Sequence, residues 1–352
     1  MKNGVVSIVV SIVVSIFVSI FVSMLVSGRR IRSQMAMLTL AVLALAMGSA
    51  PSMAQSWPNK TVKFILPLGP GSGADIGARL FADHLSRRWG KPVVVENRPG
   101  ADGVLAINAV LAAKDDHTLL WGPSSTFVGH PYTLAKIPYD MRDLQPVARI
   151  SSTVVCLVVP TAMKIESMKE FIAQVRAQPG KMNWTSVTTV TDIIMAGYFK
   201  NAGLDISQIA YRDPVSGLND LVEGRIHLYS GACVIARAQV QAGKARMLAV
   251  MNRTRGPGLD LPTVTEAGVP ELSFDGLVGL IAARASGLTD AARDRIVADV
   301  KAVGTDPVVV ERLTATGQLV IPGTGADFTA SIAEQSAQLA VTAKMLDIRP
   351  KQ

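Results

Sequence analysis

Short apolar runs alternate with amphipathic segments along the chain, and this alternation limits the possible folds more than any other feature of the sequence. The run Val62–Pro67 is followed by a helical pattern over Asp75–Trp89. The strand-like Val93–Glu96, the helical Val104–Lys114 and the strand-like Thr118–Trp121 come next. This order predicts an α/β fold, with a mostly parallel, doubly wound sheet that is covered by helices on both faces.

A second series of the same kind begins near Met182. Its predicted strands are Met182–Ser186, Ile209–Tyr211 and Ile226–Ser230, and its predicted helices are Asp192–Ala202 and Leu218–Glu223. The repetition of strand and helix predicts a second doubly wound lobe.

Two further apolar runs flank the second series. Thr153–Val159 precedes the second series, and Phe274–Ala282 follows it. Because one hydrophobic core rarely serves more than about 250 residues, we expect two lobes that are joined by these two crossover strands, with a ligand cleft between them.

The expected lobe boundaries follow from the crossover positions. We expect residues 55–154 and 277–352 to form the first lobe and residues 155–276 to form the second. Three helical patterns after the return complete the first lobe, at residues 289–303, 307–316 and 326–344.

The amino terminus has the order of a secretory signal. Basic residues precede an apolar core at Leu38–Met47, and small residues of Ser52-Met53-Ala54 occupy the cleavage positions. We expect export to the periplasm, with cleavage after Ala54. Upstream, the repeat Val5–Val26 is long enough to cross a bilayer. This repeat is either a membrane anchor or part of an over-long signal, or translation starts downstream of it, at Met24 or Met35, and the repeat is not made. We favour the downstream start.

Much of the net charge belongs to this leader. Residues 1–54 contain four basic and no acidic residues, so their removal lowers the net charge from +8 to +4. The remaining chain shows no block of Lys and Arg, and the whole sequence has only four Trp and five Tyr. A nucleic-acid partner is therefore not expected.

Cys156 and Cys233 are the only cysteines of the chain. An oxidising compartment permits a disulfide between them, but two cysteines in apolar surroundings are also often small buried hydrophobes. The sequence leaves both alternatives open. Their spacing is not that of a redox C-x-x-C motif.

A glycine-rich turn joins the first predicted strand to its helix and contains Gly71, Ser72, Gly73, Ala74 and Asp75. Glycines let the backbone approach a ligand closely, and a helix start offers unpaired N–H groups and a positive dipole end. The turn is therefore a candidate anion site, with helix capping the favoured role of Asp75 itself. A dinucleotide fingerprint with Glu96 as the ribose ligand is the rival interpretation, but the glycine spacing does not fit it. We expect no cofactor.

The sequence contains no recognisable catalytic constellation. The four histidines are scattered without metal-ligand spacing, and no serine lies in a Gly-x-Ser-x-Gly motif. We therefore expect neither an enzyme nor a metal site. The histidines are His84, His117, His130 and His227.

Several short motifs, in this order and spacing, are typical of one receptor family. They are Trp57-Pro58, the glycine turn, Pro92–Ala101, Pro138-Tyr139-Asp140, Ala242-Gly243-Lys244 with Leu248-Ala249-Val250, and Leu261–Val264 through Glu266-Ala267-Gly268. Over residues 57–350 the chain resembles the Bug-type extracytoplasmic receptors of tripartite tricarboxylate transporters.

This resemblance implies a type II periplasmic-binding-protein fold and a small carboxylate-bearing ligand, such as a di- or tricarboxylate, an amino acid or an aromatic acid. It implies a monomeric receptor that serves a membrane permease. Carried over to this chain, its ligand-binding residues are Gly71, Ser72, Gly73, Ala74, Asp75, Ser124, Ser125 and Thr126 in the first lobe, and Thr185, Ser186, Val187, Thr188, Thr189, Thr191, Asp192 and Asp213 in the second.

The sequence departs from the family pattern in the second lobe. Thr185–Asp192 stands where family members have a Gly/Ser-rich loop, and Ile194 stands where they have a histidine. Two hypotheses follow for Asp192. Its carboxylate faces the cleft and favours a ligand with an amino or hydroxyl donor, or it caps the helix that starts there.

Two other functions remain as alternatives. The same receptor fold serves membrane signalling systems, and sequence does not separate that role from transport. An enzyme that binds a nucleotide cofactor at the glycine turn is the less favoured alternative.

The leader assignment is tested by mass spectrometry of the protein isolated from cells. We expect the mature chain to begin at Gln55, because the cleavage positions before it carry small residues. Peptides from Val5–Val26 in the cellular protein would contradict both the cleavage after Ala54 and a translation start at Met24 or Met35.

Overall fold

The computed structural model describes residues 57–134, 136–211, 214–256 and 258–349. Contacts between residues separate a compact unit, Trp57–Gln352, from Met1–Ser56. The predicted signal peptide, the Val5–Val26 repeat and the candidate site residue Asp213 lie outside the described residues.

The first sheet has six strands in the order β11-β4-β10-β3-β1-β2. Strand β1 pairs in parallel with β2 and β3, whereas β10 runs antiparallel to β3 and β4, and β11 antiparallel to β4. The strands are β1 (Val62–Leu66), β2 (Val93–Asn97), β3 (Thr118–Pro123), β4 (Leu144–Thr153), β10 (Gly276–Ala283) and β11 (Gln318–Thr324).

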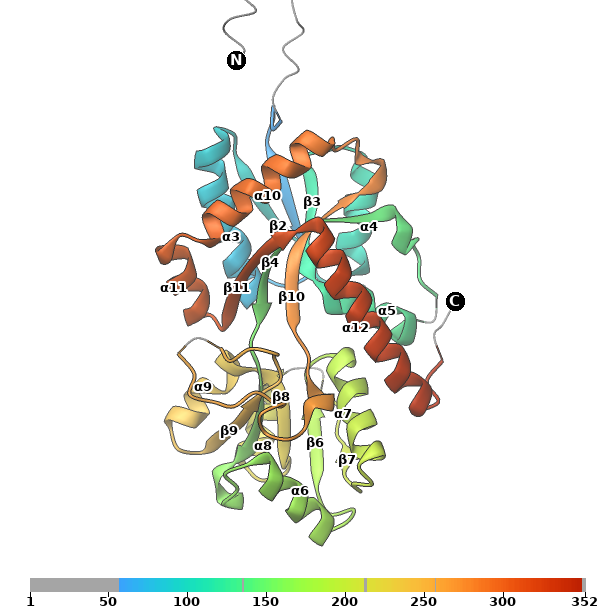
Figure 1. Cartoon of the computed structure of the whole chain (residues 1–352), viewed down its shortest axis with the longest axis vertical. Coiled ribbons are helices and arrows are strands. Elements are labelled where there is room, and N and C mark those ends of the chain that lie inside the picture. Colours follow the sequence, from blue (N-terminus) through green and yellow to red (C-terminus); the bar gives the residue numbers. More distant parts are fainter. Residues whose placement is uncertain (1–56, 135, 212–213, 257, 350–352) are drawn as a thin grey trace, which may run out of the picture. The chain divides into compact units, whose positions relative to one another are not determined.

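Helices cover both faces of this sheet (Figure 1). On β1, Phe64 points to one face and Ile65 to the other, because successive side chains of a strand alternate. The face of Phe64 packs against α3 (Gly73–Trp89), α10 (Asp290–Gly304) and α11 (Pro307–Ala315). The face of Ile65 packs against α4 (Val104–Ala113), α5 (Ser124–Thr133) and α12 (Gly325–Met345).

The second sheet has five strands in the order β7-β6-β8-β5-β9. Strand β6 pairs in parallel with β7 and β8, and β5 runs antiparallel to β8 and β9. The strands are β5 (Val155–Pro160), β6 (Asn183–Ser186), β7 (Ser207–Gln208), β8 (Leu228–Ala232) and β9 (Ala245–Val250), and the helices are α6 (Met168–Ala177), α7 (Thr189–Asn201), α8 (Pro214–Val222) and α9 (Cys233–Gln241).

Both sheets are mixed, so the prediction of mostly parallel sheets was wrong. The reason lies in the crossovers. Strand β4 leads out of the first sheet toward β5, and β10 returns to it, so neighbouring exit and return strands must run in opposite directions (Figure 1). The strand predicted at Ile209–Tyr211 is also displaced, since β7 contains only Ser207 and Gln208.

A fully buried amide holds the two crossover segments together. The Asn252 carbonyl oxygen accepts from the Val155 amide at 2.9 Å, and its NH₂ group donates to Ser152 Oγ and the Thr153 carbonyl, each at 3.0 Å. The same NH₂ group lies 3.4 Å from an Asp275 carboxylate oxygen on the return segment. One side chain therefore binds the segment that leaves the first sheet and lies against the segment that returns.

Cys156 and Cys233 form a disulfide, which settles the alternative that the sequence left open. Cys156 lies on β5 and Cys233 begins α9, and the two Cα atoms are 5.0 Å apart. Both side chains are buried in the second-sheet core. The disulfide therefore attaches the start of α9 to the strand that enters the second sheet.

The double variant Cys156→Ala/Cys233→Ala tests the contribution of this disulfide. We expect the free energy of unfolding to fall by about 2 to 4 kcal/mol, because the bond closes a long loop in the unfolded chain. Denaturant titration measures the loss, and dithiothreitol should lower the midpoint of the wild type but not that of the variant. Equal stability of both proteins would contradict the expectation.

Candidate functional site

A cavity of about 350 Å³ is lined by residues from both sheets and both crossover segments. The crossovers contribute Thr153 and Val155 on the way out and Phe274 and Gly276 on the return. The other lining residues are Leu68, Asp102, Pro123, Ser125, Thr126, Gly129, Thr133, Val187, Thr188, Thr189, Val190, Thr191 and Ala232.

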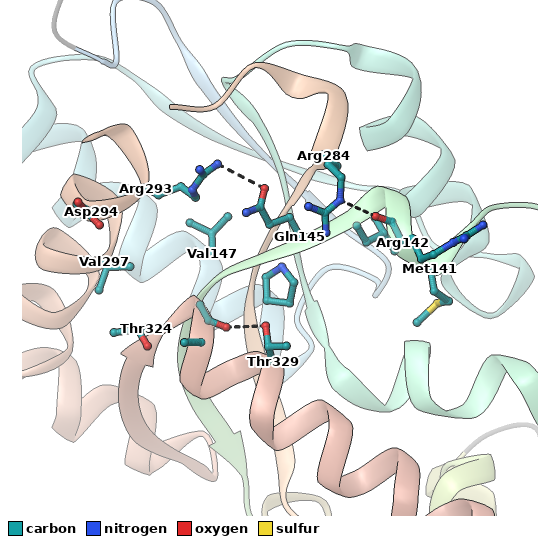
Figure 2. Close-up of a pocket in the computed structure, with 14 residues that line it drawn as sticks. Met141, Arg142, Gln145, Val147, Arg284, Arg293, Asp294, Val297, Thr324 and Thr329 are labelled. Atoms are coloured by element: carbon teal, nitrogen blue, oxygen red, sulfur yellow. Dashed lines mark hydrogen bonds between the residues drawn. The ribbon is translucent and has the colours of Figure 1, made fainter. Parts of the chain in front are cut away.

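A larger hollow of about 610 Å³ lies elsewhere, beside β4, α10 and the start of α12. Figure 2 shows its side chains engaged with one another, with Arg293 directed at Gln145 and Arg284 at the backbone oxygen of Arg142. It contains none of the predicted site residues. We therefore place the candidate site in the smaller cavity.

The amino-terminal ends of three helices border the smaller cavity. Pro123 precedes α5, Thr188 precedes α7 and Ala232 precedes α9, and all three residues line it. Pro123 and Ala232 have no side-chain oxygen, so the first turns of α5 and α9 lack a side-chain cap. Uncapped N–H groups and the positive ends of the helix dipoles create a favourable site for an anion.

The hydroxyl-rich loop before α7 is held by its own hydrogen bonds. Thr188 Oγ1 accepts from the Thr191 amide at 3.3 Å and so caps the helix. Ser186 Oγ and Thr191 Oγ1 lie 2.9 Å apart, and the Thr191 hydroxyl donates to the Thr188 carbonyl at 2.8 Å. Thr189 is exposed beside this network. The hydroxyls of Ser186, Thr188 and Thr191 thus hold the loop together.

Asp192 holds this loop from the side that faces away from the cavity lining. Its carboxylate accepts from Ser186 Oγ at 2.7 Å and from Gln208 Nε2 at 2.6 Å, and it is not among the residues that line the cavity. Burial raises the pKa of Asp192, although both hydrogen bonds act in the opposite direction. Of the two hypotheses for Asp192, the capping role is wrong, because Thr188 lies one turn earlier and caps α7.

The glycine turn is held by hydrogen bonds to its own residues. Ser72 caps α3, so the predicted capping role of Asp75 was also wrong. The Asp75 carboxylate instead accepts from the Gly71 amide at 3.0 Å and from Asn97 Nδ2 at 2.8 Å, and it pairs with Arg79. The turn thus supplies its own anion.

Hydrogen bonding decides the charge state of Asp75. Burial alone raises the pKa of this carboxyl, but hydrogen bonds from Arg79, Gly71 and Asn97 outweigh burial and place the pKa below its usual value. Asp75 is therefore ionised at neutral pH and holds the turn that carries Leu68 to the cavity.

The structure divides the predicted site residues into two groups. Those that line the cavity are Ser125, Thr126, Val187, Thr188, Thr189 and Thr191. Those described residues that do not line it are Gly71, Ser72, Gly73, Ala74, Asp75, Ser124, Thr185, Ser186 and Asp192. Ser124, for example, is fully buried and donates to Gln335 Oε1 at 2.7 Å.

Sequence reasoning missed the crossover residues, Ala232 and Asp102. The crossovers were located in the sequence, but alternation along a strand does not tell which of its residues face a cavity. The sequence could have indicated Asp102, because it is an acidic residue inside a glycine-containing turn, directly after Gly100 and Ala101.

One cluster has the composition of a metal site, Asp115, Asp116 and His117. His117 Nδ1 lies 2.6 Å from an Asp116 carboxylate oxygen, and Nε2 accepts from the Asn59 amide at 3.1 Å. Both ring nitrogens are thus engaged within the protein. The cluster positions the loop before β3 rather than offering a free imidazole.

The family model described as the tripartite tricarboxylate transporter family receptor, TctC, matches residues 77–347. The chain belongs to this family. Its resemblance to Bug-type receptors is thereby confirmed, as is the prediction of a receptor rather than an enzyme. Members of the TctC family are periplasmic binding proteins, and within the described residues of this chain no helix is long and apolar enough to cross a membrane.

Individual relatives agree with this assignment. Protein BugT of Bordetella pertussis is 30% identical over 65% of this chain and 72% of its own length. The structure of a periplasmic transporter has a TM-score of 0.71 at 29% identity, and the R. palustris protein solved with adipate has 0.71 at 26%. Each covers 84% of this chain and 99% of its own, which confirms the predicted two-lobed binding-protein fold.

The variant Asp75→Asn tests the internal anion of the glycine turn. We expect it to lose about 1 to 3 kcal/mol of stability at neutral pH, because three hydrogen-bond donors lose a charged acceptor. The folded-state pKa of Asp75 is lowered, so its contribution is complete above the unfolded pKa of about 3.9 and disappears as pH falls through the folded value.

Denaturant titrations of both proteins across this pH range measure the difference. The gap between wild type and variant should narrow below about pH 4. A gap that stays constant down to low pH would contradict the role assigned to this carboxylate.

Proposed function

We propose that this TctC-family receptor binds a small carboxylate-bearing solute in the 350 Å³ cavity and delivers it to a tripartite tricarboxylate-type permease. The observation that carries this proposal is the convergence of the starts of α5, α7 and α9 on one cavity. A carboxylate placed there satisfies backbone N–H groups and meets the positive ends of helix dipoles.

The composition of the cavity supports this mode of binding. Lys and Arg are absent from the described residues that line it, whereas Ser125, Thr126 and Thr189 offer hydroxyl donors. An anion is therefore held by amides and hydroxyls rather than by an ion pair. The R. palustris relative solved with adipate, a dicarboxylate, agrees with this ligand class.

The two crossovers provide a mechanism for capture. We assign residues 55–154 with 277–352 to one lobe and 155–276 to the other, so that the starts of α5 and α7 belong to opposite lobes. A ligand that contacts both helices stabilises the closed arrangement by its greater affinity for that arrangement. Rotation about the segments held by Asn252 would open the cavity.

The remaining parts of the proposal concern the mature protein. It begins at Gln55, works as a monomer and presents its closed form to the permease. Direct ligand contacts come from Ser125, Thr126 and the residues 187–189 and 191, while the turn 71–75 and Asp192 hold the walls of the cavity in place.

A panel of carboxylic acids tests the ligand class. We expect at least one di- or tricarboxylate, amino acid or aromatic acid to raise the melting temperature and to give a saturable isotherm in calorimetry, because ligands that bind only the folded state stabilise it. Failure of every acid to bind would contradict the proposal.

A matched pair of variants locates the site. Thr189→Val removes an exposed hydroxyl from the smaller cavity and should weaken the bound acid about tenfold, as expected for a lost hydrogen bond to a charged group. Thr329→Val makes the same exchange in the larger hollow and should leave affinity unchanged. The opposite outcome would place the ligand in the larger hollow.

A further inference from the structure

Asp102 is the only charged residue among the described residues that line the smaller cavity. Its side chain is 58% exposed, so its carboxylate is accessible to a ligand. The partners of this carboxylate are weak, since Thr133 Oγ1 donates to Oδ2 at 3.3 Å and His130 Nε2 lies 3.8 Å away. No Lys or Arg is recorded in an ion pair with Asp102 among the described residues.

The backbone of Asp102 is held in an uncommon conformation. Its φ is +54°, in the left-handed region that Asp and Asn tolerate better than most residues. Gly103, at φ +91°, follows as the residue that precedes α4. The backbone from which the Asp102 side chain projects is therefore set by a turn.

A buried pair of side chains fixes this turn. His130 is fully buried, and its Nε2 donates to the Asp102 carbonyl oxygen at 2.8 Å. The Tyr139 hydroxyl forms a hydrogen bond with Nδ1 of the same ring. Burial, and then the charge of Asp102, raise the pKa of Tyr139, so the phenol keeps its proton.

Nε2 carries the hydrogen that it donates to a carbonyl oxygen, and Tyr139 occupies the other ring nitrogen, so both nitrogens of His130 are engaged. His130 therefore holds the backbone of Asp102 in place. The positive ends of three helix dipoles border the cavity, and one carboxylate, that of Asp102, lines it.

We propose that Asp102 makes this receptor selective for carboxylic acids that also carry an ammonium group, as amino acids do. The carboxylate of such a ligand lies at the helix starts and its ammonium group pairs with Asp102. A second carboxylate in the ligand, as in a simple dicarboxylate, would face Asp102 and be repelled. The inference rests on the proposed function, because it assumes that the cavity binds an acid.

Pairs of acids that differ only in an α-ammonium group test the inference. The probes are succinate and aspartate, glutarate and glutamate, and 3-phenylpropionate and phenylalanine, each titrated by calorimetry at pH 7. In the pair that binds best, we expect the wild type to favour the ammonium-bearing member at least about tenfold.

The variant Asp102→Asn should reduce this preference to near unity, because it weakens the binding of the amino acid and not that of the acid without the ammonium group. Asn tolerates the left-handed backbone and keeps a side-chain oxygen for Thr133, so the fold should persist, and a circular-dichroism melt verifies this. The control Asp83→Asn removes one negative charge from the exposed surface of α3, where Asp83 pairs with Arg87, and should keep the wild-type ratio.

The outcomes separate the two proposals. If acids bind without preference for the ammonium-bearing member, or if the preference survives in Asp102→Asn or falls equally in Asp83→Asn, the role of Asp102 is overturned while the acid receptor stands. If no member of any pair binds to the wild type and the wider acid panel also fails, the proposed function is overturned and the role of Asp102 falls with it.

Discussion

The hydrogen bonds of one buried amide are the constraint on which the two-sheet arrangement depends. Asn252 binds the segment that leaves the first sheet and lies 3.4 Å from Asp275 on the one that returns, and a polar group buried this deeply is costly unless it is fully paired. Because Thr153 and Val155 line the cavity, the hydrogen bonds that they form with Asn252 also hold part of its wall. The candidate site therefore lies where the chain passes between the two sheets.

Helix starts supply the chemistry of this cavity, and side chains adjust it. Helices α5, α7 and α9 each follow a strand, so their amino-terminal ends gather at the strand ends, where open α/β sheets bind ligands. Uncapped backbone amides suit a carboxylate, and they need no Lys or Arg beside it. Asp102 adds a single negative charge, held by His130 and Tyr139, and so provides the basis for discrimination among acids.

Asp75 and Asp192, the two acidic residues that the sequence suggested as helix caps, bind groups inside the protein. Asp75 binds the Gly71 amide of its own turn, and Asp192 binds Ser186 and Gln208 behind the cavity wall. Local sequence pattern suggests a cap for both, since Asp near a helix start is common in that role. It does not reveal that Ser72 and Thr188, one turn earlier, already fill it.

The sequence by itself determined the alternation of strands and helices, the two series and the approximate crossovers, because hydrophobic periodicity depends only on near neighbours. It did not indicate α5, in which Gly129 and Pro131 weaken the helical pattern. Only the tertiary structure decided that Cys156 and Cys233 are bonded, and that Asp102 rather than Asp192 lines the cavity. These facts depend on contacts between residues far apart in the chain, which are set by packing and crossover geometry and not by local pattern.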